Sequence, residues 1–210
     1  MPEKNVPEKK LPEKKLPEKK LRVYVPVTVP MLRRLLTERE IFPVGGTAFA
    51  VTPALREAYA SGDDEELAEV AMSEAARASL RLIAAEREDL ADALEEALEP
   101  SGDGAPEPGP SAHGGPVYRR AVLAADVTGA VPRPDLDDAV VKLSGPIPYD
   151  RIASAHVDLA EAEPEIAKAV EVIDAADLGD EDAEFVLGDA EDHQLAWYAN
   201  QELPFLVELL

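Results

Sequence analysis

The stretch RVYVPVTVPMLRRLL, residues 22–36, contains the change of pattern on which the fold class depends. Residues 22–28 are rich in β-branched and aromatic side chains, which predicts a strand. Pro30 then opens a segment whose apolar residues recur at helical spacing, which predicts a helix. Because Pro26 has no amide proton, we expect the strand to lie at a sheet edge or to carry a bulge.

The same order of strand and helix returns further along the chain. Residues 47–51 predict a second strand, after which Thr52 is placed to cap a helix and Pro53 to occupy its first turn. Residues 63–98 predict a long helix, because acidic residues stand at its start and apolar residues follow at helical spacing. We expect Pro100 to end this helix.

The rest of the chain contains the remaining predicted strands and helices, and their order indicates the fold class. Strands are predicted at residues 118–127, 139–144 and 152–158, and helices at residues 163–176 and 190–203. Asp189 is the expected cap of the last helix. This order predicts an α+β protein with a mixed, largely antiparallel sheet covered on one side by helices.

Composition changes abruptly at two places. Residues 1–21 repeat PEKK units with a proline every five residues, which predicts a low-complexity, disordered tail. Residues 99–116 hold five prolines and five glycines, and are either a flexible insertion or a linker between two domains. We expect residues 22–210 to form a single α+β domain that contains this segment as an insertion.

The charge balance restricts the partners of the protein. Against 21 lysines and arginines stand 43 aspartates and glutamates, a net charge of −22, so nucleic acid is not an expected partner. The absence of cysteine excludes disulfides and thiolate metal sites. No apolar run approaches the roughly 20 residues of a membrane span, and no secretory signal follows the lysine-rich start, so we expect a cytoplasmic protein without membrane contact.

Several stretches of the body carry a resemblance to a known family. They are RVYVPVTVP (22–30), AFAVTPALREAY (48–59), SEAARASLRL (73–82), AVLAADV (121–127), AHVD (155–158) and LGDEDAEFVLGDAEDHQLAWYANQEL (178–203). They resemble an uncharacterised family of small actinobacterial proteins, a domain of unknown function. The resemblance covers residues 22–210 apart from the proline-rich segment, and the PEKK repeat lies outside it. It implies a bacterial, cytoplasmic, single-domain protein and no particular chemistry.

An acidic segment near the C-terminus partly matches a calcium-loop template. Its first, third, fifth and twelfth positions are filled by Asp180, Asp182, Glu184 and Glu191. Phe185 stands where the loop requires glycine, so we interpret the segment as an acidic surface around a short apolar stretch. Asp189 and His193 form a further pair at i,i+4, which is weak evidence for a metal ligand set. We predict no metal ion and no cofactor.

His156 and Asp158 are the strongest candidates for acid–base chemistry. They lie two residues apart on a predicted strand and therefore share one face. No nucleophile, glycine-rich phosphate loop or second carboxylate accompanies them at a recognisable spacing. A structural role or solvent exposure explains His156 better, and we assign no catalytic residue.

The predicted helix over residues 190–203 supplies a candidate contact with a partner. On a helix, the only tryptophan, Trp197, points away from the apolar stripe. His193, Asn200 and Gln201 lie on the same polar side as Trp197, and together the four form a candidate contact surface. Burial of Trp197 under the following residues is favoured over exposure.

These observations support two functions. The leading hypothesis is a non-enzymatic protein-binding or regulatory module, because residues 158–208 hold 16 acidic side chains and one basic one, which suit a basic partner. The alternative is a small hydrolase or metal-dependent enzyme that uses His156, Asp158 or the cluster from Asp180 to His193. An enzyme would gather these groups in one cleft with perturbed pKa values, whereas a binding module would leave them dispersed.

Overall fold

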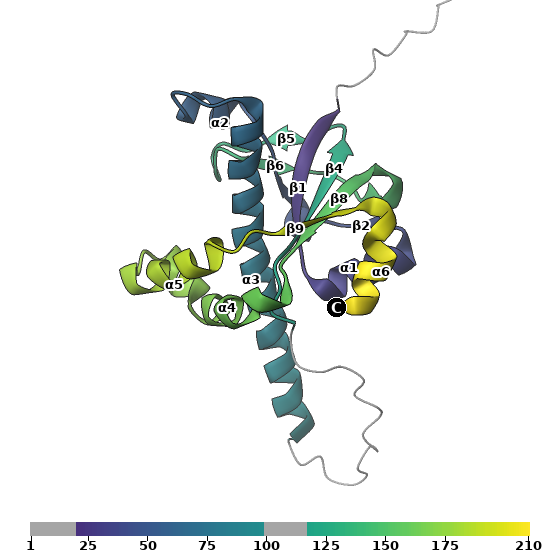
Figure 1. The fold of residues 1–210 in the computed structure, drawn as a ribbon, viewed down its shortest axis with the longest axis vertical. Coiled ribbons are helices and arrows are strands. Elements are labelled where there is room, and N and C mark those ends of the chain that lie inside the picture. The colour runs from purple at the N-terminus through teal and green to yellow at the C-terminus, as the bar shows by residue number, and fades with distance from the viewer. Residues whose placement is uncertain (1–19, 99–116) are drawn as a thin grey trace, which may run out of the picture.

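The computed structural model describes residues 20–98 and 117–210, and it has the predicted α+β architecture (Figure 1). The strands are β1 (Leu21–Val27), β2 (Glu40–Ile41), β3 (Thr47–Phe49), β4 (Ala121–Val127), β5 (Val131–Pro132), β6 (Val140–Lys142), β7 (Ile147–Pro148), β8 (Ile152–Val157) and β9 (Ala196–Ala199). The helices are α1 (Val29–Glu38), α2 (Pro53–Ala58), α3 (Asp64–Leu98), α4 (Glu163–Asp177), α5 (Glu181–Glu191) and α6 (Leu203–Leu209). The insertion at 99–116 and all but the end of the predicted tail lie outside the described residues, and β1 already begins at Leu21.

Seven strands form the main sheet, in the order β5-β6-β3-β1-β4-β8-β9. Every ladder between the described strands is antiparallel, and β2 and β7 form a separate pair. The longest ladder joins β1 to β4, from Leu21 opposite Val127 to Val27 opposite Ala121. These two strands therefore form the centre of the sheet.

The prediction from Pro26 of an edge position or a bulge was wrong, because β1 is central and its register with β4 is unbroken. β1 lies between β3 and β4, and Pro26 is paired with Val122 of β4. On its other side, β1 pairs with β3 only at Tyr24 opposite Phe49. Pro26 lies beyond the end of that short ladder, so its missing amide proton interrupts no recorded pair with β3.

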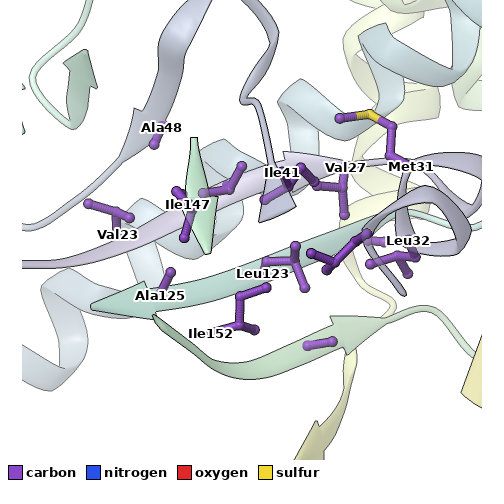
Figure 2. Close-up of a cluster of buried hydrophobic side chains, with 14 of the residues drawn as sticks. Val23, Val27, Met31, Leu32, Ile41, Ala48, Leu123, Ala125, Ile147 and Ile152 are labelled. Carbon is purple, nitrogen blue, oxygen red and sulfur yellow. The ribbon is translucent and has the colours of Figure 1, made fainter. Parts of the chain in front are cut away.

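Helices cover both faces of the sheet, and not one face as predicted. Val23, Val25 and Val27 point to a core shared with α1, α6 and the β2–β7 pair (Figure 2). Tyr24, by the alternation of side chains along a strand, points to the opposite face and packs in the core beneath α2 and α3. Both faces of the central strands are apolar, which requires a cover on each side.

Helix α3 crosses the sheet and is fixed to it by a buried serine. The Ser79 hydroxyl donates to the carbonyl of Val27 at 2.8 Å and accepts from the amide of Ala121 at 3.1 Å. It thus contacts β1 and β4 where their ladder ends. None of the helices in residues 20–98 and 117–210 is long and apolar enough to cross a membrane.

The hairpin of α4 and α5 packs on the side of α3 that faces away from the sheet (Figure 1). A separate apolar cluster holds it there, in which Leu80 and Ile83 of α3 meet Ile166 of α4 and Leu187 of α5. Helix α3 is therefore packed between the sheet and the hairpin, and it buries apolar residues on two sides.

The predicted helix over residues 190–203 is wrong. Helix α5 ends at Glu191, the chain then rejoins the sheet as β9, and α6 begins only at Leu203. The cap of α5 is Asp180, whose carboxylate accepts from the amide of Ala183 at 2.9 Å, and Asp189 is not a cap. The apolar spacing of this segment fits a helix, but pairing with β8 determines its conformation. Trp197 and Tyr198 also have high β-strand propensity.

Candidate functional site

A pocket of about 730 Å³ lies between the N-terminal half of α3, the face of the sheet beneath it and the segment that joins α5 to β9. Tyr24 of β1 and His156 of β8 contribute from the sheet, and Met72 and Glu74 from α3. His193 contributes from the joining segment. These residues come from four parts of the chain that are distant in sequence, and Arg120 adds a fifth.

His156 lines this pocket as a neutral imidazole. Burial, and then the positive charge of Arg22, lower the pKa of His156 below its usual value. Its Nε2 lies 3.2 Å from the hydroxyl of Ser154, which is buried. His156 is therefore uncharged at neutral pH and available for hydrogen bonding, with a hydroxyl and not a carboxylate beside it.

Asp158 shares a face with His156 as predicted but serves a different purpose. Its carboxylate accepts from Nε and Nη2 of Arg120 at 2.9 and 2.8 Å, and from the backbone amide of Arg120 at 2.8 Å. Both side chains are almost fully buried. Arg120 also donates to the carbonyl of His193 at 2.7 Å, so the buried pair fixes the wall of the pocket that precedes β9.

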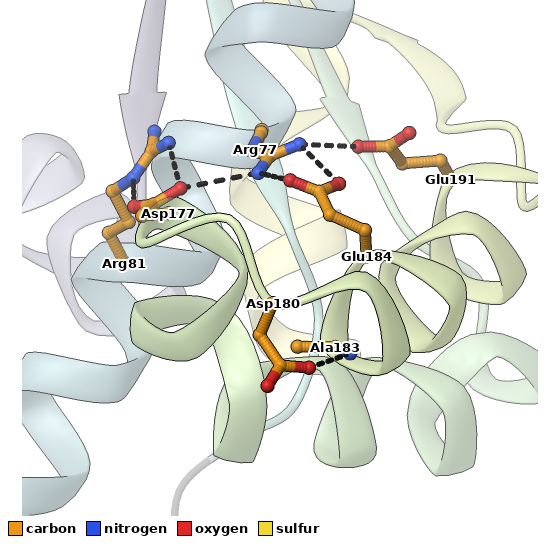
Figure 3. A network of polar contacts seen from close by, with 7 residues as sticks. All are labelled: Arg77, Arg81, Asp177, Asp180, Ala183, Glu184 and Glu191. Atoms are coloured by element: carbon orange, nitrogen blue, oxygen red, sulfur yellow. Dashed lines mark hydrogen bonds and ion pairs between the residues drawn. The ribbon is translucent and has the colours of Figure 1, made fainter.

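Two acidic residues of the calcium-loop template, Glu184 and Glu191, are held by Arg77 of α3 (Figure 3). Arg77 binds Glu184 at 2.7 Å and lies 3.8 Å from Glu191, and its neighbour Arg81 holds Asp177 at 2.5 Å. The hydrogen bond from Arg77 lowers the pKa of Glu184, and the hydrogen bond from Arg81 lowers the pKa of Asp177. These ion pairs tie the α4–α5 hairpin to α3.

No metal centre results from this arrangement in the part of the chain that the structure describes. No three histidine, aspartate or glutamate side chains there converge on a point that could hold an ion. Asp180 is engaged as the cap of α5, and Glu184 is engaged by Arg77. The acidic segment thus acts within the fold, through a cap and through ion pairs.

The pocket itself is lined by carboxylates. Glu65, Glu69, Glu74 and Glu191 all contribute to its wall. Burial, and then the charge of Asp137, raise the pKa of Glu74. Glu74 has no hydrogen-bond or ion-pair partner among the described residues, although Arg77 and Arg81 partly offset its raised pKa from a distance. Glu74 thus contributes to the pocket a half-buried carboxylate without a direct partner.

Replacing Glu74 by glutamine is expected to stabilise the protein at neutral pH. A carboxyl whose pKa is raised by folding favours the native state below its unfolded pKa of about 4.3, and that contribution is lost as the pH rises through the folded pKa. Since solvent screens this partly exposed group, we expect a gain below about 1 kcal/mol, measured by urea unfolding at pH 7.

The pH dependence and a matched variant identify the cause of this gain. The difference between Glu74→Gln and the parent protein should shrink towards pH 4, where both side chains are uncharged. Glu95→Gln, at an exposed position on α3, should change little. A Glu74→Gln variant that is less stable than its parent at pH 7 would contradict this prediction.

The four residues predicted to share a contact surface lie in different environments. His193 lines the pocket and lies 3.7 Å from Glu165. Trp197 is 61% exposed, so the favoured burial of this side chain was wrong. Asn200 is tied to Tyr149, whose hydroxyl donates to its carbonyl at 2.8 Å, and Gln201 is exposed. The four residues would share a polar face only if residues 190–203 were a helix, and this helix does not form.

Trp197 is next to the pocket through strand pairing. It lies opposite His156 in the β8–β9 ladder, and His156 lies opposite Val122 of β4, which packs beneath α3. Side chains that are opposite each other across a ladder share a face of the sheet. Trp197 is therefore on the face that carries the pocket.

The backbone of Trp197 points to the open edge of the sheet. The amide of Asp158 donates to the carbonyl of Arg120 and therefore points towards β4. Because backbone groups alternate in direction along a strand, the amide of His156 points the same way. His156 and Trp197 are thus a pair without hydrogen bonds between their backbones. The N–H and C=O of Trp197 face away from β8, on a strand that has no second partner among the described strands.

The neighbouring residue supports this geometry. The amide of Ala199, two residues beyond Trp197, donates to the Glu202 side chain at 2.8 Å and is therefore not directed to β8. Glu202 satisfies the edge at Ala199, whereas no described group does so at Trp197. One residue of the edge thus remains open to a hydrogen-bonding partner.

The sequence identified some members of this site and missed others. His156 and His193 were singled out, and the pocket brings them together. Tyr24, Glu74 and Arg120 were missed, because nothing in their spacing relates them to the histidines. The alternation in β1 was a usable signal for Tyr24, since it separates this residue from the valines on either side.

A comparison with family models gives one match over most of the chain. Residues 21–207 match the family of unknown function DUF6912. No curated protein and no solved structure gives a match. The match begins at the first residue of β1 and therefore excludes most of the PEKK repeat.

Proposed function

We propose a function from geometry, because the chain belongs to this family of unknown function, whose description assigns no activity. In this proposal the protein is a non-enzymatic binding module that receives an extended segment of a partner protein along β9. The observation that carries the proposal is Trp197, exposed on an edge strand with its backbone hydrogen-bonding groups directed outwards. Unpaired strand edges are templates for the addition of another strand.

The exposed side chain of Trp197 supplies a second kind of contact at this edge, in addition to the backbone hydrogen-bonding groups. Large aromatic side chains surrounded by polar groups are typical anchors of protein interfaces. An added strand would place its backbone beside that of Trp197 and alternate side chains over the face that holds the pocket. Backbone hydrogen bonds would thus supply affinity, and the pocket would supply selectivity.

The charge of the region favours a basic segment. Residues 158–208 carry 16 acidic side chains against Lys168, and Glu65, Glu69 and Glu74 line the pocket beside them. Complementary charge accelerates association and excludes partners of like charge. The partner segment is therefore proposed to be extended and to carry lysine or arginine at alternate positions.

We favour binding over catalysis because two carboxylates on which the alternative depends are already engaged. Asp158 is bound by Arg120, and Glu184 by Arg77. Within the described ranges, the hydrogen-bond partner of His156 is the buried Ser154, and no carboxylate orients the imidazole for base catalysis. A hydrolytic role would need an accessible nucleophile beside a histidine, but the hydroxyl beside His156 belongs to Ser154, which is buried and does not line the pocket.

Replacing Trp197 by alanine is expected to abolish partner binding and to spare the fold. The side chain is exposed, so the free energy of unfolding should change by less than about 1 kcal/mol. The loss of an interface anchor typically costs about 2 kcal/mol or more in binding. The measurement is a selection of short random peptides on the intact protein, followed by titration of the enriched peptides against the variant.

Phe205→Ala is the matched control, because Phe205 is an aromatic side chain of similar exposure on α6. It should bind the selected peptides as the parent protein does. The proposal is overturned if no peptides are enriched, if the enriched peptides are acidic, or if their binding survives Trp197→Ala.

A further inference from the structure

Tyr24 presents to the pocket a hydroxyl that has no partner among the described residues. Its side chain is only 9% exposed and lines the pocket, and no described residue forms a hydrogen bond with its hydroxyl. The hydroxyl itself is not enclosed by protein, because Oδ1 of Asn200 is the only buried side-chain oxygen or nitrogen without a hydrogen bond among the described residues. The hydroxyl of Tyr24 therefore opens into the pocket, where it is available to a ligand.

The charges of the wall define the class of that ligand. Arg77 and Arg120 also line the pocket, but Glu184 binds the first at 2.7 Å and Asp158 binds the second at 2.8 Å. Neither guanidinium is free to attract an anion. Among the described residues of the wall, Glu65, Glu69 and Glu74 are therefore opposed by no free guanidinium.

A metal ion does not fit the same surroundings. A divalent cation needs several oxygen or nitrogen ligands on one point, and no such group exists among the described residues. The carboxylates are spread over a pocket of about 730 Å³, which is within the range of sites for small organic molecules. Met72 and Leu195 add apolar surface to the wall.

We propose that this pocket is a binding site for an organic cation, an ammonium or guanidinium group carried on an apolar body. Glu74 accepts hydrogen bonds from the cationic group, and Tyr24 offers its hydroxyl to the same ligand. Met72 and Leu195 contact the apolar body. This site goes beyond the proposed function and stands whether or not β9 receives a strand.

Two sources of such a cation are distinguished by the probes. Agmatine carries a guanidinium and an ammonium group on a short apolar chain and represents a free small molecule. The blocked tripeptide acetyl-Ala-Arg-Ala-amide represents an arginine side chain of a protein partner. Glutarate, which is of similar length and opposite charge, is the control.

The test is calorimetric titration of the full chain with each probe. We expect saturable binding of agmatine or of the tripeptide with a Kd of about 1 mM or tighter, and no binding of glutarate. Binding of agmatine alone assigns the site to a free amine, whereas binding of both assigns it to a side chain. The proposal is overturned if neither cation binds, or if glutarate binds as well as they do.

Variants locate the binding in the pocket. Glu74→Gln should weaken the cation about tenfold, since a charge-assisted hydrogen bond becomes a neutral one, and Tyr24→Phe should weaken it to a smaller extent. Glu95→Gln should bind as the parent does. Because Glu74→Gln is expected to be the more stable protein, weaker binding by it does not reflect unfolding. Equal binding by Glu74→Gln and Glu95→Gln would place the cation elsewhere and overturn the proposal.

Discussion

Replacing Arg120 by methionine is expected to destabilise the protein by about 3–5 kcal/mol. The guanidinium and the carboxylate of Asp158 are almost completely buried and are joined by two side-chain hydrogen bonds. Removing one partner leaves a charge without compensation in an apolar environment, which is among the most costly single changes in a protein. Urea unfolding followed by circular dichroism measures the loss.

A second substitution separates the buried charge from lost packing. Asp158→Asn in the Arg120→Met background removes the charge and keeps an oxygen that accepts from the backbone amide of residue 120, as Asp158 does at 2.8 Å. We expect the double variant to recover about 2 kcal/mol or more of the loss. A single variant that loses less than about 1 kcal/mol would show that the pair does not stabilise the fold.

Replacing Leu187 by alanine is expected to cost about 2–5 kcal/mol. Leu187 is fully buried in the cluster that joins α5 to α3 and α4. Truncation leaves a cavity between helices that are also held by the ion pairs of Arg77, so the surroundings cannot collapse freely to fill it. Thermal and urea unfolding both report the loss.

Phe185→Ala is the control for Leu187→Ala. The two residues lie two positions apart on α5, and Phe185 is 75% exposed. Its truncation should change the free energy of unfolding by no more than about 0.5 kcal/mol. Equal losses in both variants would mean that α5 does not present Leu187 to the core.

The ion pairs of Figure 3 connect these results with the pocket. Arg77 lines the pocket and holds α5, and Arg120 lines it and holds the carbonyl of His193. The pocket wall is therefore built from the same contacts that attach the α4–α5 hairpin and the segment after it. Loss of either arginine should loosen the site together with the fold.

The acidic C-terminal region shows how far a charge pattern alone can be interpreted. Part of it faces α3, where Arg77 and Arg81 neutralise Asp177, Glu184 and, more distantly, Glu191. Sequence distance concealed these pairs, because Arg77 is more than 100 residues from Glu184. The unpaired acids around the pocket are fewer than the sequence count suggests, and they are the ones relevant to a partner.

Local patterns predicted much of the framework. Thr52 accepts from the amide of Leu55 at 3.1 Å and caps α2, as its position before Pro53 indicated. Helix α3 runs from Asp64 to Leu98, close to the predicted bounds. Caps, prolines and helical spacing act over a few residues, so their effects can be read without knowledge of the rest of the chain.

The set of local elements, the α+β class and the strong negative charge follow from the amino-acid sequence alone. Contacts between distant segments determine the face that each element covers and the conformation of residues 196–199. Their spacing suits a helix, but the open edge of β8 makes them a strand, because pairing between distant segments outweighs a weak local preference. The same pairing exposes Trp197 and places it beside His156, and the packing of α3 over the sheet brings Tyr24 and Glu74 to one pocket.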